Sequence, residues 1–327
     1  MLPLGVLDLV PVREGETPRD ALPRSLALAR HTEKLGYQRF WVAEHHNMPG
    51  IASAATSVVM GYLAGGTERI RIGAGGIMLP NHAPLLIAEQ FGTLESLYPG
   101  RIDLGLGRAP GTDQTTLRAM RRDPRSAEHF VYDVKELQSL LGPVEPGQLI
   151  QAVPGGGTQV PLWILGSSLY GAQVAAALGL PYAFAAHFAP DALHEALQLY
   201  REQFVAQGKL QRPHVMLGVN IVVADTDNEA ARLFTTVQQG FALLHRGQRG
   251  RQRPPIDDIE QFWSPAEKAM ANRMLRSAVV GSPATVRKGI EALVAATQAD
   301  ELLIVSNIYD TDARLRSYSL LATIAGT

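Results

Sequence analysis

The chain has 327 residues, of which 46% are hydrophobic and 19% are charged, values typical of a globular protein with a sizeable buried core. Its formal net charge of -1 gives no electrostatic basis for nucleic acid or an anionic membrane as the main partner. Cysteine is absent, which excludes disulfides, thiolate nucleophiles and cysteine-based zinc sites, and favours a reducing compartment such as the cytoplasm.

The first stretch, MLPLGVLDLVP, is apolar but has no basic region and no small-residue cleavage site. Asp8 and Pro11 interrupt it early, so we interpret it as a strand and not as a signal peptide. No uninterrupted apolar run elsewhere reaches the length that a membrane-spanning helix needs. We therefore expect a cytoplasmic protein.

Apolar runs alternate with helical patterns along the chain. Strands are expected at 4–10, 39–44, 70–79, 101–107, 161–166, 182–186, 215–224 and 301–306. Helices are expected at 20–35, 54–64, 84–97, 127–141, between 166 and 178, at 191–207, from 228, and at 284–296 and 314–321. Apolar strands that alternate with helices indicate a parallel sheet covered by helices. Eight such units predict one (β/α)8 TIM barrel domain over 1–327, and a doubly wound sheet is the alternative.

Two segments fall outside this repeat. One is 143–160, which contains a turn of three consecutive glycines, and the other is the polar stretch 240–281. Long insertions in compact domains are usually lids or disordered loops. The second insertion contains RGQRGRQR (246–253), the only basic run, which we interpret as a solvated loop or as a lid over an anionic cofactor.

Polar residues gather where the expected strands end. The set comprises Glu44, His45, His46, Asn81, His82, Arg108, Ser167, Ser168 and His187. Barrel enzymes carry their active sites at the carboxyl ends of the strands, so this set predicts the functional face. The alternative is that strand ends meet loops, and loops are polar.

The adjacent histidines His45 and His46 suggest either metal binding or proton transfer. Neighbouring residues of an extended chain point to opposite sides, so the two do not naturally share one ion. A mononuclear metal bound by Glu44, His82 and His187 is an alternative, although the HExxH motif is absent. Proton transfer is more natural, because histidine gives or takes a proton near neutral pH.

Two further motifs suit a flavin mononucleotide. The glycines of GAGG (73–76) lie within an apolar strand and indicate either a bulge or a surface on which a flat ligand rests. GSSLYG (166–171) joins a strand to a helix, where backbone amides with Ser167 and Ser168 can hold a phosphate or serine can simply cap the helix. GLGRAPG (105–111) has the wrong spacing for a dinucleotide loop, but Arg108 is a candidate anion ligand.

Four segments together carry a family resemblance: AEHHNMPG, GAGGIMLPNHAP, AEQFGTLESLYPGRIDLGLGRAPGTD and ILGSSLYGA. The combination resembles the bacterial luciferase-like flavin-dependent monooxygenases, and within them the single-subunit branch that emits no light. The resemblance is densest over 40–113, recurs at 161–180, and extends weakly to both ends.

The resemblance implies a barrel that binds reduced FMN at its carboxyl face, usually as a dimer. The family's catalytic histidine falls on His45, and Glu44 stands beside it. An unusual cis peptide between residues other than proline falls between Gly75 and Gly76. The cofactor-binding residues that we expect are Gly75, Gly76, Asn81, Arg108, Gly166, Ser167 and Ser168. The small-residue helix at 54–64 is the candidate contact of the dimer, and the alternative is that it simply packs on the barrel.

Three positions depart from the light-emitting members. Gly166 stands where they have an acid, Tyr170 where they have a threonine, and Gly107 where they have a reactive cysteine. Phosphate binding would then rely more on backbone amides and Ser168. The departures argue against light emission and a fatty-aldehyde substrate.

The implied reaction starts from FMN that a separate flavin reductase has reduced. Its reaction with O2 would form a flavin C4a-(hydro)peroxide that oxygenates a small organic substrate. His45 would manage the proton, while Glu44 and Asn81 orient neighbouring groups. Two alternatives stay open: hydride transfer with the deazaflavin F420, and a flavin-binding protein without catalysis.

Overall fold

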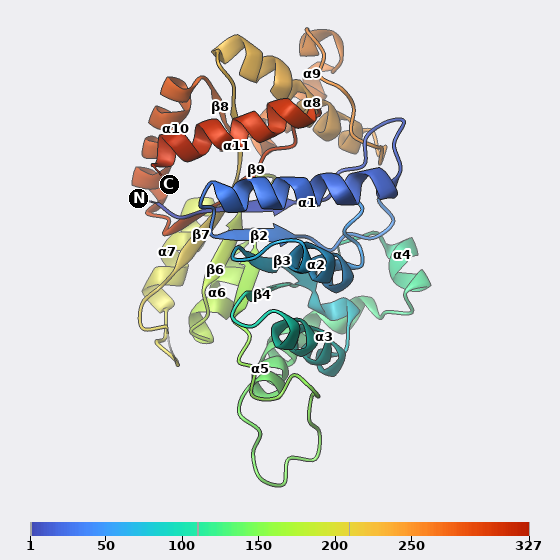
Figure 1. The fold of residues 1–327 in the computed structure, drawn as a ribbon, viewed down its shortest axis with the longest axis vertical. Coiled ribbons are helices and arrows are strands. Elements are labelled where there is room, and N and C mark those ends of the chain that lie inside the picture. Colours follow the sequence, from blue (N-terminus) through green and yellow to red (C-terminus); the bar gives the residue numbers. More distant parts are fainter. Residues whose placement is uncertain (1, 110, 209, 327) are drawn as a thin grey trace.

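A closed barrel of parallel strands forms the centre of the protein in the computed structural model, which describes residues 2–109, 111–208 and 210–326 (Figure 1). The sheet order is β6-β5-β4-β3-β2-β1-β9-β7-β8, and a pairing of β6 with β7 closes it. The strands are β1 (Leu4–Asp8), β2 (Arg39–Val42), β3 (Arg71–Met78), β4 (Ile102–Gly107), β5 (Leu162–Gly166), β6 (Tyr182–Ala185), β7 (Val215–Val223), β8 (Val279–Gly281) and β9 (Glu301–Val305). The predicted barrel is confirmed, and closure overturns the doubly wound alternative.

Helices alternate with these strands and surround them (Figure 1). They are α1 (Pro18–Lys34), α2 (Thr56–Gly65), α3 (Pro84–Leu97), α4 (Gln114–Ala119), α5 (Phe130–Leu141), α6 (Leu169–Ala177), α7 (Leu193–Gln203), α8 (Asp227–His245), α9 (Pro265–Met274), α10 (Pro283–Thr297) and α11 (Thr311–Ala325). Short 3-10 helices are η1 (Leu79–Asn81), η2 (Pro124–His129) and η3 (Ile259–Gln261). No helix within the described ranges is long and apolar enough to cross a membrane.

The core has two main parts, one outside the barrel and one inside it. Apolar residues of the helices pack against the outward side chains of the strands, as Phe40 and Phe91 do. The interior is filled by a second cluster that includes Trp41, Trp163 and Met216. Two-residue alternation along each strand separates the two sets.

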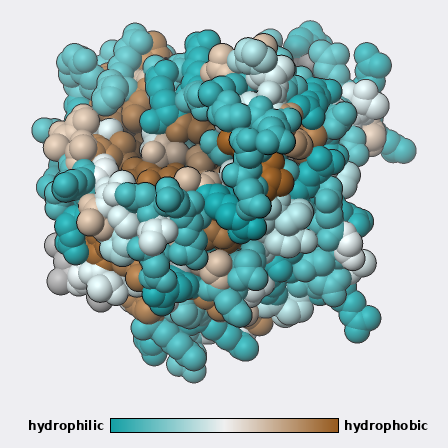
Figure 2. Space-filling view, turned by 90° about the horizontal axis from the view of Figure 1, so that it is seen from above, coloured by the Kyte–Doolittle hydropathy of each residue, from teal (hydrophilic) through white to brown (hydrophobic). Residues whose placement is uncertain are grey.

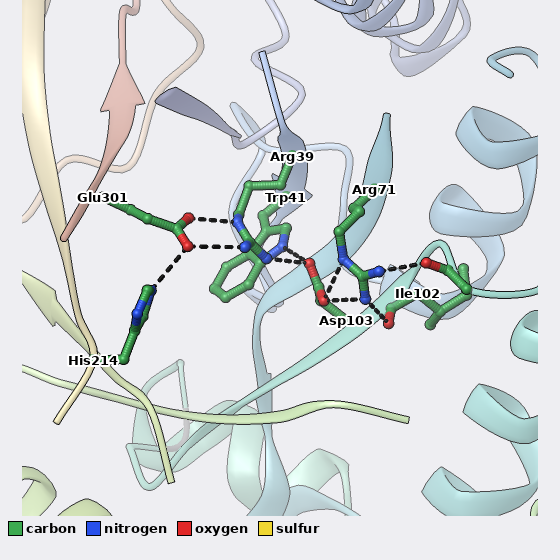
Figure 3. Close-up of polar contacts among 8 residues, drawn as sticks. Arg39, Trp41, Arg71, Ile102, Asp103, His214 and Glu301 are labelled. Atoms are coloured by element: carbon green, nitrogen blue, oxygen red, sulfur yellow. Dashed lines mark hydrogen bonds and ion pairs between the residues drawn. The ribbon is translucent and has the colours of Figure 1, made fainter. Parts of the chain in front are cut away.

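At the amino-terminal end of the barrel the interior is charged (Figure 3). The guanidinium of Arg39 lies between two carboxylates, 2.6 Å from Asp103 and 2.8 Å from Glu301. Arg71 contacts Asp103 at 2.6 Å, and His214 contacts Glu301 at 2.9 Å. Each buried charge therefore has an opposite charge or a hydrogen-bond partner beside it, which is the condition for burying charge without a large penalty.

The structure agrees with the first predicted insertion and differs from the second in where it begins. Residues 143–160 contain no helix or strand, as expected, and in Figure 1 they project beyond α5. The prediction of an insertion from 240 is wrong, because α8 continues to His245. Ala242 is buried against Trp263 and Ala271, so the helix keeps its apolar face past Gly240, where an added Cβ atom would meet no neighbouring atom within 4 Å. The remainder contains η3, α9 and β8.

Candidate active site

The predicted site residues lie at the carboxyl ends of neighbouring strands. Glu44 and His45 follow β2, Gly75 and Gly76 lie within β3, and Asn81 is in η1 directly after β3. Arg108 follows β4; Gly166 ends β5, and Ser167 and Ser168 lead into α6. Because all these strands are parallel, their carboxyl ends meet at one mouth of the barrel. His187 reaches the same mouth from the end of β6.

Glu44 is the centre of a hydrogen-bonded cluster and is 1% exposed. Nε2 of His46 donates to it at 2.7 Å, and Nε2 of His82 donates at 2.9 Å. The backbone N–H of Met78 and the amide of Asn81 also donate to its carboxylate, at 2.9 and 3.2 Å. The Glu44 carboxylate therefore accepts hydrogen bonds from all these groups and so orients them.

The ionisation of Glu44 follows from these contacts. Burial by itself raises the pKa of a carboxyl, but the hydrogen bonds from His46, His82 and Met78 lower the pKa of Glu44 to about 2. Glu44 is thus an anion at neutral pH and has no proton to donate. Of the catalytic roles predicted for Glu44, the one compatible with a permanent anion is to orient neighbouring groups.

His45 stands apart from this cluster. Its Nδ1 atom is buried and has no hydrogen-bond partner among the described residues. Burial lowers the pKa of His45, and the carboxylate of Glu44 acts in the opposite direction. The structure thus distinguishes the two adjacent histidines, because His46 is tied to Glu44 while His45 keeps a ring nitrogen unengaged. The catalytic role expected for His45 stays a prediction.

The glycines of β3 form an irregular strand. The peptide between Gly75 and Gly76 is cis, which confirms the predicted bond. The register between β3 and β4 shifts between Ala74 and Ile77, which confirms the bulge interpretation. A Cβ atom at Gly76 would lie 2.6 Å from the carbonyl oxygen of Gly105, so backbone packing alone requires glycine there. A flat ligand against these glycines stays a prediction.

The expected anion site is assembled from β4 and from the start of α6. The guanidinium carbon of Arg108 lies 4.1 Å from the ring centre of Tyr170, in the first turn of α6. Ser168 is the N-cap residue of α6, yet its side chain makes no capping hydrogen bond. Arg108 therefore lies beside the start of α6. That the helix amides and the hydroxyls of Ser167 and Ser168 join it in binding a phosphate or carboxylate stays a prediction.

A cavity of about 480 Å³ adjoins this anion site and Asn81. Its lining contains two cations, Arg108 and Arg122, neither of which has an ion-pair partner among the described residues. The lining carboxylates are engaged elsewhere, since Asp113 pairs with Arg249 and Asp123 with Arg125. The cavity therefore favours an anion. Arg122 was not among the predicted site residues, because the pair Arg121–Arg122 lies between α4 and η2 and belongs to no motif.

The basic segment 246–253 contacts loops that follow β1 and β4. Its backbone bonds that of the loop after β1, because the N–H of Gln252 donates to Val12 and the N–H of Glu14 donates to Gln252, both at 2.9 Å. Arg249 contacts Asp113 at 2.8 Å, and Arg253 contacts Glu14 at 2.9 Å. These arginines thus tie the segment to neighbouring loops. Residues 246–251 are exposed and form no helix or strand, as the interpretation of a solvated loop expects, and the lid interpretation stays a prediction.

A second groove, of about 930 Å³, lies between α8, α9, β8 and the start of α10. Figure 2 looks onto this side of the molecule, where hydrophobic residues lie in recesses between hydrophilic ridges. None of the predicted site residues lines the groove. The described residues also contain no group of three or more His, Asp or Glu side chains that could hold a metal ion.

Comparisons with known proteins agree on one family. Residues 2–301 match the luciferase-like monooxygenases. A luciferase-like monooxygenase of Escherichia coli K12 is 52% identical over 96% of this chain and 94% of its own length. An N-acetyl-S-alkylcysteine monooxygenase of Bacillus subtilis is 30% identical, with 98% of each chain covered.

Solved structures agree on the fold. The crystal structure of apo-MsnO8 has a TM-score of 0.92 at 37% identity, over 100% of this chain and 99% of its own. The oxygenating constituent of a Baeyer-Villiger monooxygenase from Pseudomonas putida, in complex with FMN, has a TM-score of 0.74 at 17% identity, over 98% of this chain and 96% of its own. An F420-dependent secondary alcohol dehydrogenase has a TM-score of 0.71 at 17% identity, over 99% and 98% of the two chains. At that identity the last two show the fold alone.

Proposed function

The chain belongs to the luciferase-like monooxygenases, a family of oxidoreductases, and we propose that it uses reduced FMN and O2 to oxygenate a small organic substrate. The observation that carries the proposal is the anion site beside the barrel mouth, where Arg108 stacks on the first turn of α6. A phosphate fits its donor set, and a histidine with an unengaged ring nitrogen lies on the same face.

The residues present fit the cofactor as follows. Arg108, Ser167, Ser168 and the amides of α6 would hold the phosphate. Gly166 stands where the light-emitting members have an acid, so no carboxylate at this position repels a bound anion. When bound, reduced FMN supplies the electrons with which O2 is activated. Gly75, Gly76 and Asn81 would line the face toward the rest of the cofactor.

The protein's own part in the reaction is proton handling and exclusion of water. His45 would take up or release a proton at its unengaged ring nitrogen. Glu44, as a permanent anion, would keep His46 and His82 in position at the edge of the site. The segment 246–253 would shield the mouth from water, because it is bound to the loops that follow β1 and β4.

Hydride transfer with F420 is a second candidate. The cavity beyond Arg108 supports it, because Arg122 supplies another cation about which a longer anionic tail could bind. In that case the protein would bind F420 in preference to FMN and would not consume O2.

We also propose that the protein is a homodimer and receives its reduced flavin from a separate reductase. The outer face of α2 exposes Val58 and Tyr62, and α3 exposes Leu86 and Leu97. A face that exposes large apolar side chains suits contact with a second copy. Analytical ultracentrifugation tests this, since Val58→Glu should convert a dimer into monomers.

The cofactor is tested by titrating the protein with reduced FMN, oxidised FMN and F420. Photoreduced FMN with the protein is then mixed with O2 in stopped flow, with N-acetyl-S-alkylcysteines as the first substrates. We expect a transient absorbance that differs from the oxidation of free flavin. His45→Gln should slow product formation by about 10²- to 10⁴-fold, whereas His194→Gln, on the exposed side of α7, should not.

Tight binding of F420 without O2 consumption would favour the second candidate. Tight binding of oxidised FMN with no turnover would instead indicate a flavin-binding protein without catalysis. Equal behaviour of His45→Gln and wild type would contradict the proton-handling role.

A further inference from the structure

Residues 143–154, which we call the arm, project beyond α5 and carry exposed apolar side chains (Figure 1). The exposed fractions are 46% for Val144, 96% for Leu149, 59% for Ile150 and 73% for Val153. Of the twelve large hydrophobic side chains that are exposed in the described part of the chain, eight lie on α2, α3 and the arm. Apolar side chains scattered singly over a surface need no explanation, but such a concentration marks a contact surface.

The arm holds its shape through its own hydrogen bonds. At its base, the backbone N–H of Gly157 donates to the carbonyl oxygen of Gly142 at 2.7 Å. Near its tip, the side chain of Gln148 accepts from the backbone N–H of Glu145 at 3.2 Å and donates to the carbonyl oxygen of Ile150 at 2.8 Å. An element whose shape is already set loses little conformational freedom when it binds.

The base of the arm lies directly against α3. A Cβ atom at Gly155 would lie 2.6 Å from the carbonyl oxygen of Ala88, and one at Gly92 would overlap the backbone of Gly155, so glycine is needed for this close approach. On its other side α3 contacts α2, where the hydroxyl of Ser57 donates to Gln90 at 2.8 Å. The arm, α3 and α2 are therefore consecutive parts of one surface.

This surface is almost free of charge. Exposed residues recur every three or four positions along each helix, and they are Val58, Tyr62 and Gly65 on α2 and Leu86, Gln90, Thr93 and Leu97 on α3. Neither set contains a charged residue, and the arm contains one, Glu145. A two-fold contact places the same patch of two copies face to face, so a charged patch would meet its own charge. A patch without charges suits a second copy of the same chain.

We propose that the arm packs against a second copy of this chain and extends a two-fold contact made by α2 and α3. Its four apolar side chains add to the four that the helices expose, which brings the surface closer to the roughly 800 Å² per partner of a stable interface. An anionic lipid surface fits less well, because the arm, α2 and α3 contain no Lys, Arg or His. The inference rests on the proposed homodimer and adds an element that stabilises it.

The first test is sedimentation velocity over a dilution series, with Leu149 and Ile150 both changed to Ser. The dissociation constant of the dimer should rise about 10-fold or more. Both side chains are exposed in the single chain, so the circular dichroism spectrum should stay that of wild type. The control is Val205→Ser, which removes a half-exposed valine in the connection after α7 and should leave the dissociation constant unchanged.

The second test uses the absence of cysteine from the chain. Leu149→Cys provides a single thiol that can carry a benzophenone label. On irradiation we expect a covalent product of two chains, whereas Val205→Cys with the same label should remain a single chain. A label at position 149 that joins no second chain would overturn the proposal, and so would a wild-type dissociation constant in the double serine variant.

The remaining outcomes separate this inference from the proposals on which it builds. A dimer that Val58→Glu breaks and the arm variants leave intact would keep the proposed dimer and exclude the arm. Binding of wild type, but not of the double serine variant, to phosphatidylcholine vesicles would assign the arm to a lipid surface and overturn the proposal. Absence of turnover with FMN in a protein that still dimerises through the arm would contradict the proposed reaction alone.

Discussion

The two ends of the barrel interior differ in how completely their polar groups are satisfied. At the amino-terminal end, Arg39 lies between Asp103 and Glu301, and each carboxylate has a further partner (Figure 3). At the carboxyl end, His45 and His187 each retain a buried nitrogen without a partner among the described residues. Buried polar groups that all have partners carry no unmet hydrogen bonds, whereas groups without partners at the mouth of a barrel are candidates for contact with a ligand.

The same contrast holds for charge. The carboxylates at the amino-terminal end are matched by guanidiniums within the barrel. At the carboxyl end, Arg108 and Arg122 face a cavity while the nearest carboxylates pair elsewhere. Substitutions at the two ends should therefore have different consequences: those at the amino-terminal end should lower stability, and those at the mouth should lower binding and activity.

The largest expected effect is on stability and comes from Arg39→Met. The change leaves Asp103 and Glu301 each without its contact to a shared guanidinium in a buried environment. Removal of one partner from a buried ion pair costs about 3–5 kcal/mol. Urea denaturation followed by circular dichroism measures the loss.

The matched control for Arg39→Met is Arg316→Ala, which removes an exposed pair with Asp225. Exposed pairs contribute little, so its denaturation midpoint should remain that of wild type. Equal midpoints for both variants would show that the charged end of the barrel contributes no more than a surface contact.

The next effect concerns pH and Glu44. The pKa of this carboxyl is lowered from 4.5 to about 2 in the fold, so ionised Glu44 contributes roughly 3 kcal/mol of stability above pH 4.5. That contribution is lost as the pH falls from 4.5 to 2, because the folded state must then be protonated. Glu44→Gln should lower stability at pH 7 and flatten its fall over this interval.

Urea midpoints measured at several pH values test the change at Glu44. Glu128→Gln, at an exposed position of η2, serves as the control and should keep the wild-type slope. If Glu44→Gln kept it as well, the hydrogen bonds to His46 and His82 would not favour the carboxylate.

The smallest expected effect is on affinity. Arg108→Ala removes a charge-assisted contact worth about 1.5–3 kcal/mol, so affinity for reduced FMN should fall about 10- to 100-fold. Affinity for reduced riboflavin, which has no phosphate, should hardly change. Arg118→Ala, at an exposed position of α4, is the control. A similar loss for both flavins would place the phosphate elsewhere.

Much of the fold could be predicted because periodicity is a local property. The apolar strands from 4–10 to 301–306 all correspond to observed strands, and the helix expected at 84–97 has those bounds in the structure. The error at 240 arose from treating polar residues and Gly240 as the end of a helix. Ala242 and Leu243 continue the buried face of α8, and Trp263 and Ala271, which pack with Ala242, lie further along the chain.

The sequence predicted where the candidate site lies, but not the contacts among its residues. The strand-end rule placed Glu44, His45 and Arg108 on one face, and the family resemblance selected the Gly75–Gly76 cis peptide, which the structure contains. The same strand-end rule placed Asn81 and His82 on the face of Glu44, although it did not predict that they hydrogen-bond to its carboxylate, and His82 is 38 residues away in sequence. Arg122 was missed because it lies in a connection that carries no periodic pattern.

The sequence by itself determined the barrel, its order of strands and helices, and the face on which polar residues gather. The reason is that the hydrophobic period and the ends of strands depend on residues close together in the sequence. Only the tertiary structure decided which groups meet. Closure of the ring sets His187 across from His45 and Arg39 between Asp103 and Glu301, although these residues lie far apart along the chain. Whether a buried polar atom has a hydrogen-bond partner depends on such contacts between residues far apart in the sequence. The groups at the amino-terminal end of this barrel have partners, whereas some of those at its mouth do not.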